Sequence, residues 1–320
     1  MTAYDVFNGD ADGLCALRQL RLAQPREAVL VTGVKRDVGL LSRVPAQRGD
    51  RLVVLDISLH ENRAALEQAL AAGAACTWFD HHYPGDIPAH ALLEPHIRYA
   101  PDTCTSLLVD EHLGGRWRSW AVAAAFGDNL PGPARAAAAP LHLAEADLEL
   151  LQQVGRLLNY NAYGERIEDL HYPPVDLYRR LERYADPLEF ARGDEAFERL
   201  ARGWEEDMAR AAAVAAAVDS ATHVMVMLPD APWARRVNGP WANQLAAQDA
   251  QRAVAVLVGN GDAFTVSVRA PSARPHGADA FARQFPTGGG RPGAAGVNRL
   301  PATELPRFSA LFQAGFGPAD

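Results

Sequence analysis

The sequence has 320 residues, a formal net charge of −8 and 48% apolar residues, enough to bury two cores rather than remain disordered. The negative charge argues against a protein that coats long nucleic acid, and the three scattered cysteines argue against a disulfide framework or a zinc site. Apolar stretches shorter than the ~20 residues of a membrane helix, and the lack of a leader pattern at residue 1, predict a cytoplasmic protein without a membrane span.

Short apolar runs alternate with helix-like segments over the first 130 residues. The runs cover residues 3–7, 28–34, 51–57 and 75–82, and the helix-like segments cover 13–22, 61–72 and 117–126. Continuous apolar runs are typical of strands buried on both faces, and single helices between them give parallel pairing. We therefore predict a doubly wound parallel sheet for this part of the chain.

A linker helix and a second, smaller unit follow. Residues 131–190 are helical but irregular in pattern, and Asp194 is suited to the N-cap of a long amphipathic helix. Apolar runs then recur at 221–229, 253–259 and 264–271, with predicted helices at 239–250, 277–285 and from Leu305. The predicted fold class is α/β, with a catalytic domain at 1–190, a linker helix at 191–218 and a substrate-binding domain at 219–320.

Acids and histidines follow three of the predicted strands directly. They are Asp10, Asp12, Asp56, Asp80, His81 and His82, and a further acid, Asp128, lies in the segment AFGDNL. Parallel sheets place their chemistry at the carboxyl ends of strands, so these side chains are expected to converge. An isolated pair such as Asp10 and Asp12 is more often a helix cap or an Asx-turn. Taken together, however, carboxylates and imidazoles suit Mn²⁺ or a similar ion, and two ions would form a template for phosphoester hydrolysis.

The order of these motifs resembles the DHH family of phosphoesterases. The sequence has DADG at residues 10–13, a strand-end aspartate at 56, DHH at 80–82 and GD at 127–128, followed by GGGRPGAAG at 288–296. The last segment is similar to the glycine motif of the substrate-binding domain associated with that family. The resemblance covers nearly the whole chain and implies a metal-dependent hydrolase that acts on nucleotides or oligonucleotides.

Roles for the N-terminal residues follow from this resemblance. It implies that Asp10 ligates a first metal ion and Asp12 a second, with Asp56 bridging the two. It also implies that His81 and Asp128 complete the second ion's shell. His82 would face the scissile phosphate as a charge stabiliser or an acid, and Asp80 would orient the histidines, although a simple strand-end cap is its alternative. The expected cofactor is two Mn²⁺ ions, with Mg²⁺ or Co²⁺ as substitutes.

One position departs from the family pattern. Many relatives have a metal-ligating histidine four residues before the first aspartate, and this chain has Val6 there. Asn8 could offer a carbonyl oxygen instead, and His60, in the segment after Asp56, is a second candidate. A histidine that opens a helix is more often a solvated residue, so this alternative stays open for His60. The first metal site is expected to be weak or partly filled by water.

The C-terminal glycine segment predicts an anion site. Gly288, Gly289 and Gly290 would let backbone amides approach a phosphate or a nucleotide, although a glycine-rich turn between strand and helix is the alternative. Arg291 stands where relatives have a histidine and adds a permanent charge. Arg269 matches a family position that grips a terminal phosphate, and Asn243 is a further candidate that could equally lie on a helix surface.

Other residues carry weaker predictions. Thr105 and Ser106 either bring a hydroxyl near the phosphate or cap a helix, and Arg235 and Arg236 either bind substrate or are solvated. The aromatic residues Tyr160 and Tyr163 are assigned to core packing rather than to base stacking. Lys35 is the only lysine among 31 basic residues, which we interpret as a compositional bias without a functional meaning.

The sequence alone is compatible with two functions of different classes. The first is a metal-dependent phosphoesterase that works in a cleft between the two domains on a nucleotide or a short oligonucleotide, with no role for long duplex nucleic acid. The alternative is a nucleotide-binding or sensing module on a decayed enzyme scaffold, suggested by Val6 and Arg291. The exact substrate, the direction of attack and the formation of a homodimer are left open by the sequence.

Overall fold

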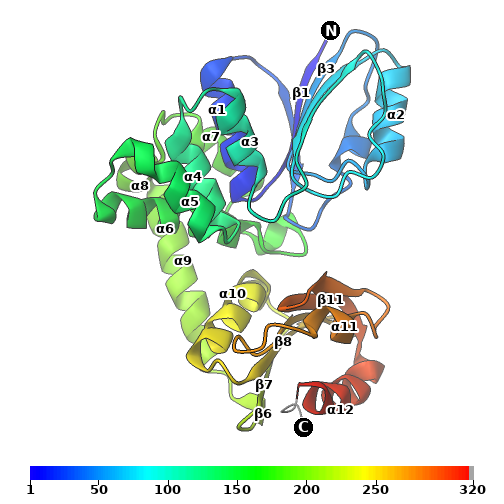
Figure 1. Ribbon diagram of the computed structural model, residues 1–320, viewed down its shortest axis with the longest axis vertical. Coiled ribbons are helices and arrows are strands. Elements are labelled where there is room, and N and C mark those ends of the chain that lie inside the picture. Colours follow the sequence, from blue (N-terminus) through cyan, green and yellow to red (C-terminus); the bar gives the residue numbers. More distant parts are fainter. Residues whose placement is uncertain (317–320) are drawn as a thin grey trace. The chain divides into compact units, whose positions relative to one another are not determined.

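The computed structural model describes residues 1–316, which divide into two compact units with the boundary between Gly203 and Trp204 (Figure 1). The α/β class predicted from the sequence is confirmed. Among the described residues, no helix has both the length and the apolar character needed to cross a membrane.

The first unit contains a five-stranded parallel sheet in the order β2-β1-β3-β4-β5. Its strands are β1 (Ala3–Asn8), β2 (Val29–Gly33), β3 (Arg51–Leu55), β4 (Ala75–Asp80) and β5 (Leu93–Ile97). The first four were predicted from their apolar runs. Strand β5 was missed because its sequence, LEPHI, contains a proline and has mostly exposed or half-buried side chains, as an edge strand allows.

Helices cover both faces of this sheet (Figure 1). Helix α2 (Arg63–Ala71) lies on one face, where Leu66 and Leu70 pack with Val54 and Trp78 of the sheet. Helix α1 (Ala11–Ala23), α3 (Thr105–His112) and α4 (Arg118–Gly127) group together on the other face. This two-sided covering explains why the strands read as continuous apolar runs.

The rest of the first unit is helical and ends in a long helix. The elements are α5 (Pro131–Ala138), α6 (Glu145–Ala162), α7 (Pro174–Leu181), α8 (Pro187–Gly193) and α9 (Glu195–Ala212), with 3₁₀ turns at Leu40–Arg43, Ala139–Leu141 and Ile167–Asp169. Asp194 precedes α9, and its Oδ1 accepts a hydrogen bond of 2.8 Å from the Ala196 amide, as the sequence predicted for an N-cap. The boundary between the units falls inside α9.

The second unit has a six-stranded sheet in the order β10-β11-β9-β8-β7-β6, in which only β7 and β8 pair in parallel. Its elements are β6 (Ala216–Asp219), β7 (His223–Leu228), α10 (Pro232–Gln248), β8 (Ala253–Asn260), β9 (Ala263–Arg269), α11 (Ala278–Ala282), β10 (Gly288–Arg291), β11 (Ala294–Pro301), a 3₁₀ turn at Ala302–Glu304, and α12 (Leu305–Gly315). A phenylalanine cluster of Phe281, Phe308 and Phe312 forms the core between the sheet and its helices α11 and α12.

The glycine segment is a strand and not a turn between strand and helix. Residues 288–291 form β10, which pairs with β11 across the two residues Pro292 and Gly293. A Cβ on Gly288 would lie 1.7 Å from the Ala282 carbonyl oxygen, so a side chain there would clash with the backbone of α11. Gly290 has a φ of +142°, which also favours glycine. These two glycines are therefore explained by packing and backbone shape.

Candidate metal centre

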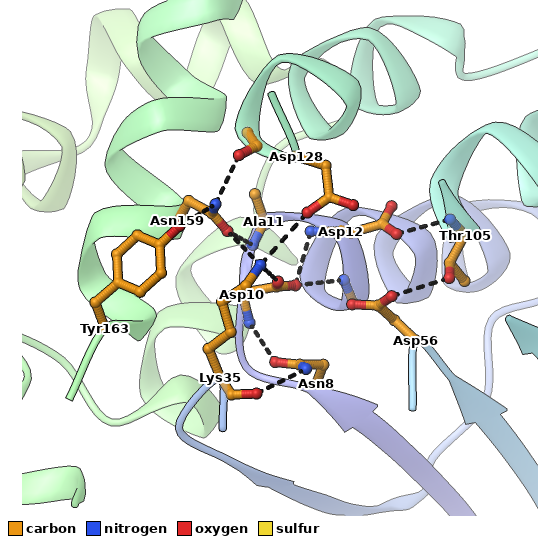
Figure 2. Close-up of polar contacts among 12 residues, drawn as sticks. Asn8, Asp10, Ala11, Asp12, Lys35, Asp56, Thr105, Asp128, Asn159 and Tyr163 are labelled. Atoms are coloured by element: carbon orange, nitrogen blue, oxygen red, sulfur yellow. Dashed lines mark hydrogen bonds and ion pairs between the residues drawn. The ribbon is translucent and has the colours of Figure 1, made fainter. Parts of the chain in front are cut away.

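The strand-end acids and histidines meet at one edge of the parallel sheet. Strands β1 and β3 are neighbours in the middle of the sheet, and the chain winds outward from them in opposite directions, which makes this edge a topological switch point. Figure 2 shows Asp10 and Asp12 at the start of α1, Asp56 after β3 and Asp128 at the end of α4. His81 and His82, which follow β4, lie within 4 Å of Asp56. The predicted convergence of these side chains is thus what the structure shows.

Asp10 caps helix α1 and also faces the cluster. Its Oδ1 accepts hydrogen bonds from the amides of Asp12 at 3.0 Å and Gly13 at 3.1 Å. The helix cap, which was the alternative to metal binding for this residue, therefore accounts for Oδ1 but not for Oδ2. Gly13 is needed beside it, because a Cβ there would lie 2.1 Å from the Asn8 carbonyl oxygen. The second carboxylate oxygen, Oδ2, is ion-paired with the ammonium of Lys35.

Asp12 joins the start of α1 to the start of α3. Its Oδ2 and Oδ1 accept hydrogen bonds from the amides of Thr105 and Ser106, each at 2.7 Å, and the Ser106 hydroxyl donates to the Asp12 carbonyl oxygen at 2.8 Å. The N-cap residue of α3, Cys104, makes no side-chain hydrogen bond to the helix. The fully buried Asp12 carboxylate caps α3 in its place. The carboxylate is held in one orientation, and each oxygen keeps a second lone pair.

Asp56 occupies an unusual backbone conformation at the centre of the cluster. Its φ is +58°, a region that aspartate enters more readily than most residues, and its amide donates to the Phe79 carbonyl oxygen at 3.1 Å. The Thr105 hydroxyl donates to Asp56 Oδ1 at 3.1 Å, so this hydroxyl orients a carboxylate at the centre. The same oxygen lies 3.6 Å from His81 Nε2. Backbone strain of this kind is found mainly at functional sites.

The two histidines after β4 differ in their surroundings. The His81 side chain is 13% exposed, and its Nε2 lies 3.5 Å from Asp128 Oδ2. The His82 side chain is 45% exposed, and its Nδ1 lies 2.7 Å from Oδ1 of the buried Asp80. Burial lowers the pKa of His82, but Asp80, together with the charges of Asp128 and Asp10, outweighs burial and raises this pKa above its usual value. A proton on Nδ1 shared with Asp80 leaves Nε2 as the atom that can meet a substrate.

The charge of the cluster calls for a cation. Burial and the neighbouring Asp10 and Asp12 raise the pKa of Asp56 well above its usual value, and burial also raises the pKa of Asp128. Lys35 lowers both pKa values but does not offset these effects, so the negative charge of the two carboxylates is only partly compensated. A divalent ion among these oxygens would complete the compensation and favour the ionised forms.

The donor atoms fit one such ion. Among residues 1–316, Asp12, His81 and Asp128 each offer an atom within 4.8 Å of the others, and the same holds for Asp56, His81 and His82. Carboxylate oxygens with imidazole nitrogens suit Mn²⁺ and, less specifically, Mg²⁺. His81 belongs to both sets, so the two sets describe neighbouring positions around a single centre.

Lys35 is the residue of this centre that the sequence did not reveal. It follows β2, and its Nζ pairs with Asp10 and lies 3.4 Å from Asp128 Oδ1 and 3.5 Å from Asn159 Oδ1 (Figure 2). Burial lowers the pKa of Lys35, but Asp10 and Asp128 outweigh it and raise that pKa well above its usual value. The signal was its position directly after a predicted strand, beside strands that carry acids at the same edge.

Two predicted substitutes for the missing histidine ligand have other contacts. Asn8 Oδ1 accepts from the Asp10 amide at 3.3 Å, and its Nδ2 donates to the Lys35 carbonyl oxygen at 3.2 Å. His60 is exposed, with its ring 5.6 Å from that of Tyr83, and belongs to neither set of ligand atoms in the described chain. Val6 itself is fully buried in the core beneath α2.

The aromatic and hydroxyl residues divide between the core and the site. Tyr160 is fully buried, and its hydroxyl lies 2.8 Å from His171 Nε2, as core packing predicts. Tyr163 lies beside the site, where its hydroxyl accepts from Asn159 at 3.2 Å and its ring centre is 5.8 Å from Lys35 Nζ. Core packing therefore describes Tyr160 and not Tyr163.

The second unit places two of the predicted arginines on one face of its sheet. Arg269 on β9 and Arg291 on β10 are both register partners of Ala294 on β11, and directly paired residues project to the same face. Only the small Ala294 separates them. Asn243 of α10 accepts a hydrogen bond of 2.6 Å from Arg269 Nε, which orients that guanidinium. A Cβ on Gly289, two residues before Arg291 on β10, would meet no atom of the described residues within 4 Å.

The other two arginines of this unit are used in ion pairs. Arg236 is buried and binds Asp207 of α9 at 2.7 Å, and Arg235 pairs with Asp230. Neither is the solvated residue that the sequence alternative described. We therefore leave both out of the substrate site.

Comparison with solved structures decides the fold. No family model matches the sequence, and no curated protein sequence matches it significantly. An exonuclease RecJ structure bound to manganese superposes with a TM-score of 0.60 at 20% identity, covering 98% of this chain and 89% of that one. The chain has the RecJ fold. This confirms, at the level of the fold, the resemblance drawn from the order of the motifs.

Two further structures share the RecJ fold with this chain. RecJ from Thermus thermophilus, in complex with Mn²⁺, gives a TM-score of 0.62 at 19% identity, and this chain spans about half of its length, 51%. The pGpG-specific phosphodiesterase PggH from Vibrio cholerae gives a TM-score of 0.57 at 14% identity, with 98% of both chains covered. Chains with the RecJ fold thus include a protein of similar extent to this one.

Proposed function

We propose that this chain is a divalent-metal-dependent phosphoesterase of the DHH family that hydrolyses a nucleotide or a short oligonucleotide. The observation that carries the proposal is the meeting of Asp12, Asp56, His81 and Asp128 at the switch point of the sheet, with His82 at its exposed side. The solved neighbours support it, because they are named as an exonuclease bound to manganese and a phosphodiesterase specific for pGpG.

In this proposal the ion is held by residues whose positions are fixed before it binds. Asp12, His81 and Asp128 would hold it, while the amides of Thr105 and Ser106 keep the Asp12 carboxylate in place. When bound, a divalent ion supplies neutralisation of the phosphate's charge and activation of the attacking water. Mn²⁺ is the expected ion, with Mg²⁺ or Co²⁺ as alternatives. The family resemblance predicts two ions, a number that elemental analysis of the metal-loaded chain tests.

His82 is proposed to meet the reacting phosphoryl group. Its Nδ1 is bound to the buried Asp80 at 2.7 Å, which fixes the ring and leaves Nε2 as the ring nitrogen that can meet a substrate. From there it can stabilise the transferred charge or donate a proton to the leaving oxygen. Asp80 acts through His82, as a positioning residue.

The second unit is proposed to bind a remote anionic group of the same substrate. Arg269, oriented by Asn243, and Arg291 present two permanent charges on one sheet face. The net charge of −8 favours short substrates over a long polyanion. A cytoplasmic location and a homodimer stay predictions of the sequence.

Two observations favour the alternative of a nucleotide-binding or sensing module. Asp10, the expected ligand of the first metal, is paired with Lys35, and Val6 replaces the family's histidine. A decayed enzyme would bind nucleotide without turnover. The residues expected at the reaction itself, Asp56 and the DHH motif, are all present, so we rank the enzyme first.

Turnover should depend on the added metal. After treatment with EDTA, the chain is expected to lose hydrolysis of short oligonucleotides, cyclic dinucleotides and 3′-phosphoadenosine 5′-phosphate. Mn²⁺ should restore it better than Ca²⁺, whose longer bonds require more ligands than this centre offers. Product release measured by chromatography provides the test. Equal rescue by both ions would contradict the metal assignment, and binding of nucleotide without any product would favour the sensor.

Arg291→Ala should raise KM for a substrate that carries a terminal phosphate and leave one that lacks it nearly unchanged. The expected loss is about 1.5–3 kcal/mol, the range for a hydrogen bond to a charged group. Steady-state kinetics on a matched pair of dinucleotides, with and without that phosphate, measures it. The control is Arg283→Ala, which removes an exposed arginine paired with Asp279 of α11. An equal fall in kcat for both substrates would place Arg291 at the reacting group instead.

A further inference from the structure

We infer that the ammonium of Lys35 occupies the position of the first metal ion, so that this centre binds one divalent ion beside a built-in cation. The inference rests on the proposed function for the nature of the centre. The residues around Asp10 do not fit a second divalent ion. Val6 stands where the family has a histidine ligand, and the ammonium of Lys35 already pairs with Asp10.

The geometry around Lys35 is that of a cation site. Its Nζ faces oxygens from three segments, namely Asp10 at the start of α1, Asp128 at the end of α4 and Asn159 on α6 (Figure 2). Two carboxylates and a neutral amide oxygen are ligands that a hard divalent ion would also take. Here the ammonium takes them.

The backbone fixes Lys35 in this position from two sides. Its amide donates to the Ala162 carbonyl oxygen at 3.0 Å, and its own carbonyl oxygen accepts from Asn8 Nδ2 at 3.2 Å. Asn8 in turn accepts from the Asp10 amide, so the same side chain ties the Lys35 segment to the loop that carries Asp10. The pairing is therefore built into the fold and does not depend on a freely moving surface side chain.

The partner residue Asn159 is fixed as firmly. Its Nδ2 donates to the Gly127 carbonyl oxygen at 2.6 Å and to the Tyr163 hydroxyl at 3.2 Å, which turns Oδ1 toward Lys35. Oδ1 also accepts from the Ala11 amide at 3.4 Å. Because these contacts hold the Asn159 amide oxygen toward Nζ, the oxygen is oriented to accept a hydrogen bond from the Lys35 ammonium.

The ligands for a second ion are missing in the same place. In the described chain, Asp10 belongs to neither set of three potential ligand atoms, whereas Asp12, Asp56 and Asp128 each belong to one. Val6 is buried in the core, and the Asn8 amide is used by the backbone. The side of the centre at Asp10 therefore has too few ligands among the described residues for a second ion and already contains the positive charge of Lys35. A second divalent ion would also be repelled by the ammonium at this short range.

The metal content measures this directly and requires no turnover. We expect equilibrium dialysis against Mn²⁺, followed by elemental analysis, to give one tightly bound ion per wild-type chain, with the electron paramagnetic resonance spectrum of an isolated Mn²⁺. Two ions with a spin-coupled spectrum would overturn the inference and leave the proposed phosphoesterase intact. No bound ion would overturn both.

Lys35→Met keeps the length of the side chain and removes its charge, so it should admit a second Mn²⁺ and raise the count from one to two. The matched control is Arg36→Met, which removes the adjacent cation, paired with Glu165 away from Asp10, and should stay at one. A folded Lys35→Met chain that stays at one ion overturns the role given to Lys35.

Lys35 can also be changed chemically if that variant does not fold. It is the only lysine and its side chain is 31% exposed, so amine reagents modify it and the N-terminus alone. Acetylation removes the charge and should give two ions, whereas reductive methylation keeps the charge and should give one. Equal counts after both treatments would overturn the inference.

Discussion

Asp56→Asn is expected to abolish hydrolysis while leaving the fold intact. The carboxylate lies between the two histidines and Thr105, with His81 Nε2 at 3.6 Å, and the amide of asparagine would remove its negative charge and replace one of its two oxygens by an NH2 group. We expect kcat/KM to fall on the order of 10³-fold or more, the scale for removing a principal group that stabilises charge. Asparagine tolerates the positive φ of 58° at this position, so thermal unfolding should change little.

The alanine variant separates chemistry from stability at the same residue. Asp56→Ala should be equally inactive, and it should also unfold more easily, by about 1 kcal/mol, because alanine is strained at positive φ. Asp86→Asn, an exposed acid in the loop after the DHH motif, is the control and should keep full activity. Hydrolysis by Asp56→Asn within tenfold of the wild type would contradict the place given to this carboxylate.

His82→Ala is expected to lower kcat by about 10²–10⁴-fold, the range for a positioned acid or base, with little change in KM. The reduction should apply to substrates with and without a terminal phosphate, because the proposed partner of His82 is the reacting group. Steady-state kinetics on the same pair of dinucleotides used for Arg291→Ala provides the comparison. His90→Ala, an exposed histidine, is the control.

Metal content distinguishes His82 from the ligands. His82→Ala should keep its bound Mn²⁺, since Asp12, His81 and Asp128 remain, whereas His81→Ala should lose it. A rise in KM without a fall in kcat would place His82 in substrate binding and not at the reacting phosphate.

The sheet and its acidic edge were predictable because their signals are local. An apolar run that ends in an acid, as at Leu55 and Asp56, identifies both a buried strand and the edge where it ends. Strand β5 lacked such a signal, since its Pro95 and its exposed residues are acceptable only at the edge of a sheet. The N-cap at Asp194 was predictable for the same reason as the strands, because its hydrogen bond to the Ala196 amide joins residues only two apart in the sequence.

The contacts that could not be predicted from the sequence join segments that are far apart along the chain. Lys35 meets Asp128, just after α4, and Asn159, on α6, and a single lysine has no sequence pattern that could reveal these distant contacts. Asp12 is bound by the amides of α3, a backbone contact that leaves no trace in residue types. The close approach of α11 that requires glycine at position 288 is another such contact, and the anion site predicted at the glycines of β10 stays a prediction.

The central claim is that an ion at this cluster enables hydrolysis of a short nucleotide. The most direct measurement is a titration of the metal-free chain with Mn²⁺, in which bound metal and single-turnover cleavage of a 5′-phosphorylated dinucleotide are measured in the same samples. We predict that cleavage rises in proportion to bound Mn²⁺ and reaches its plateau at one ion per chain. A chain fully loaded with Mn²⁺ that binds the dinucleotide and leaves it uncut would contradict the account.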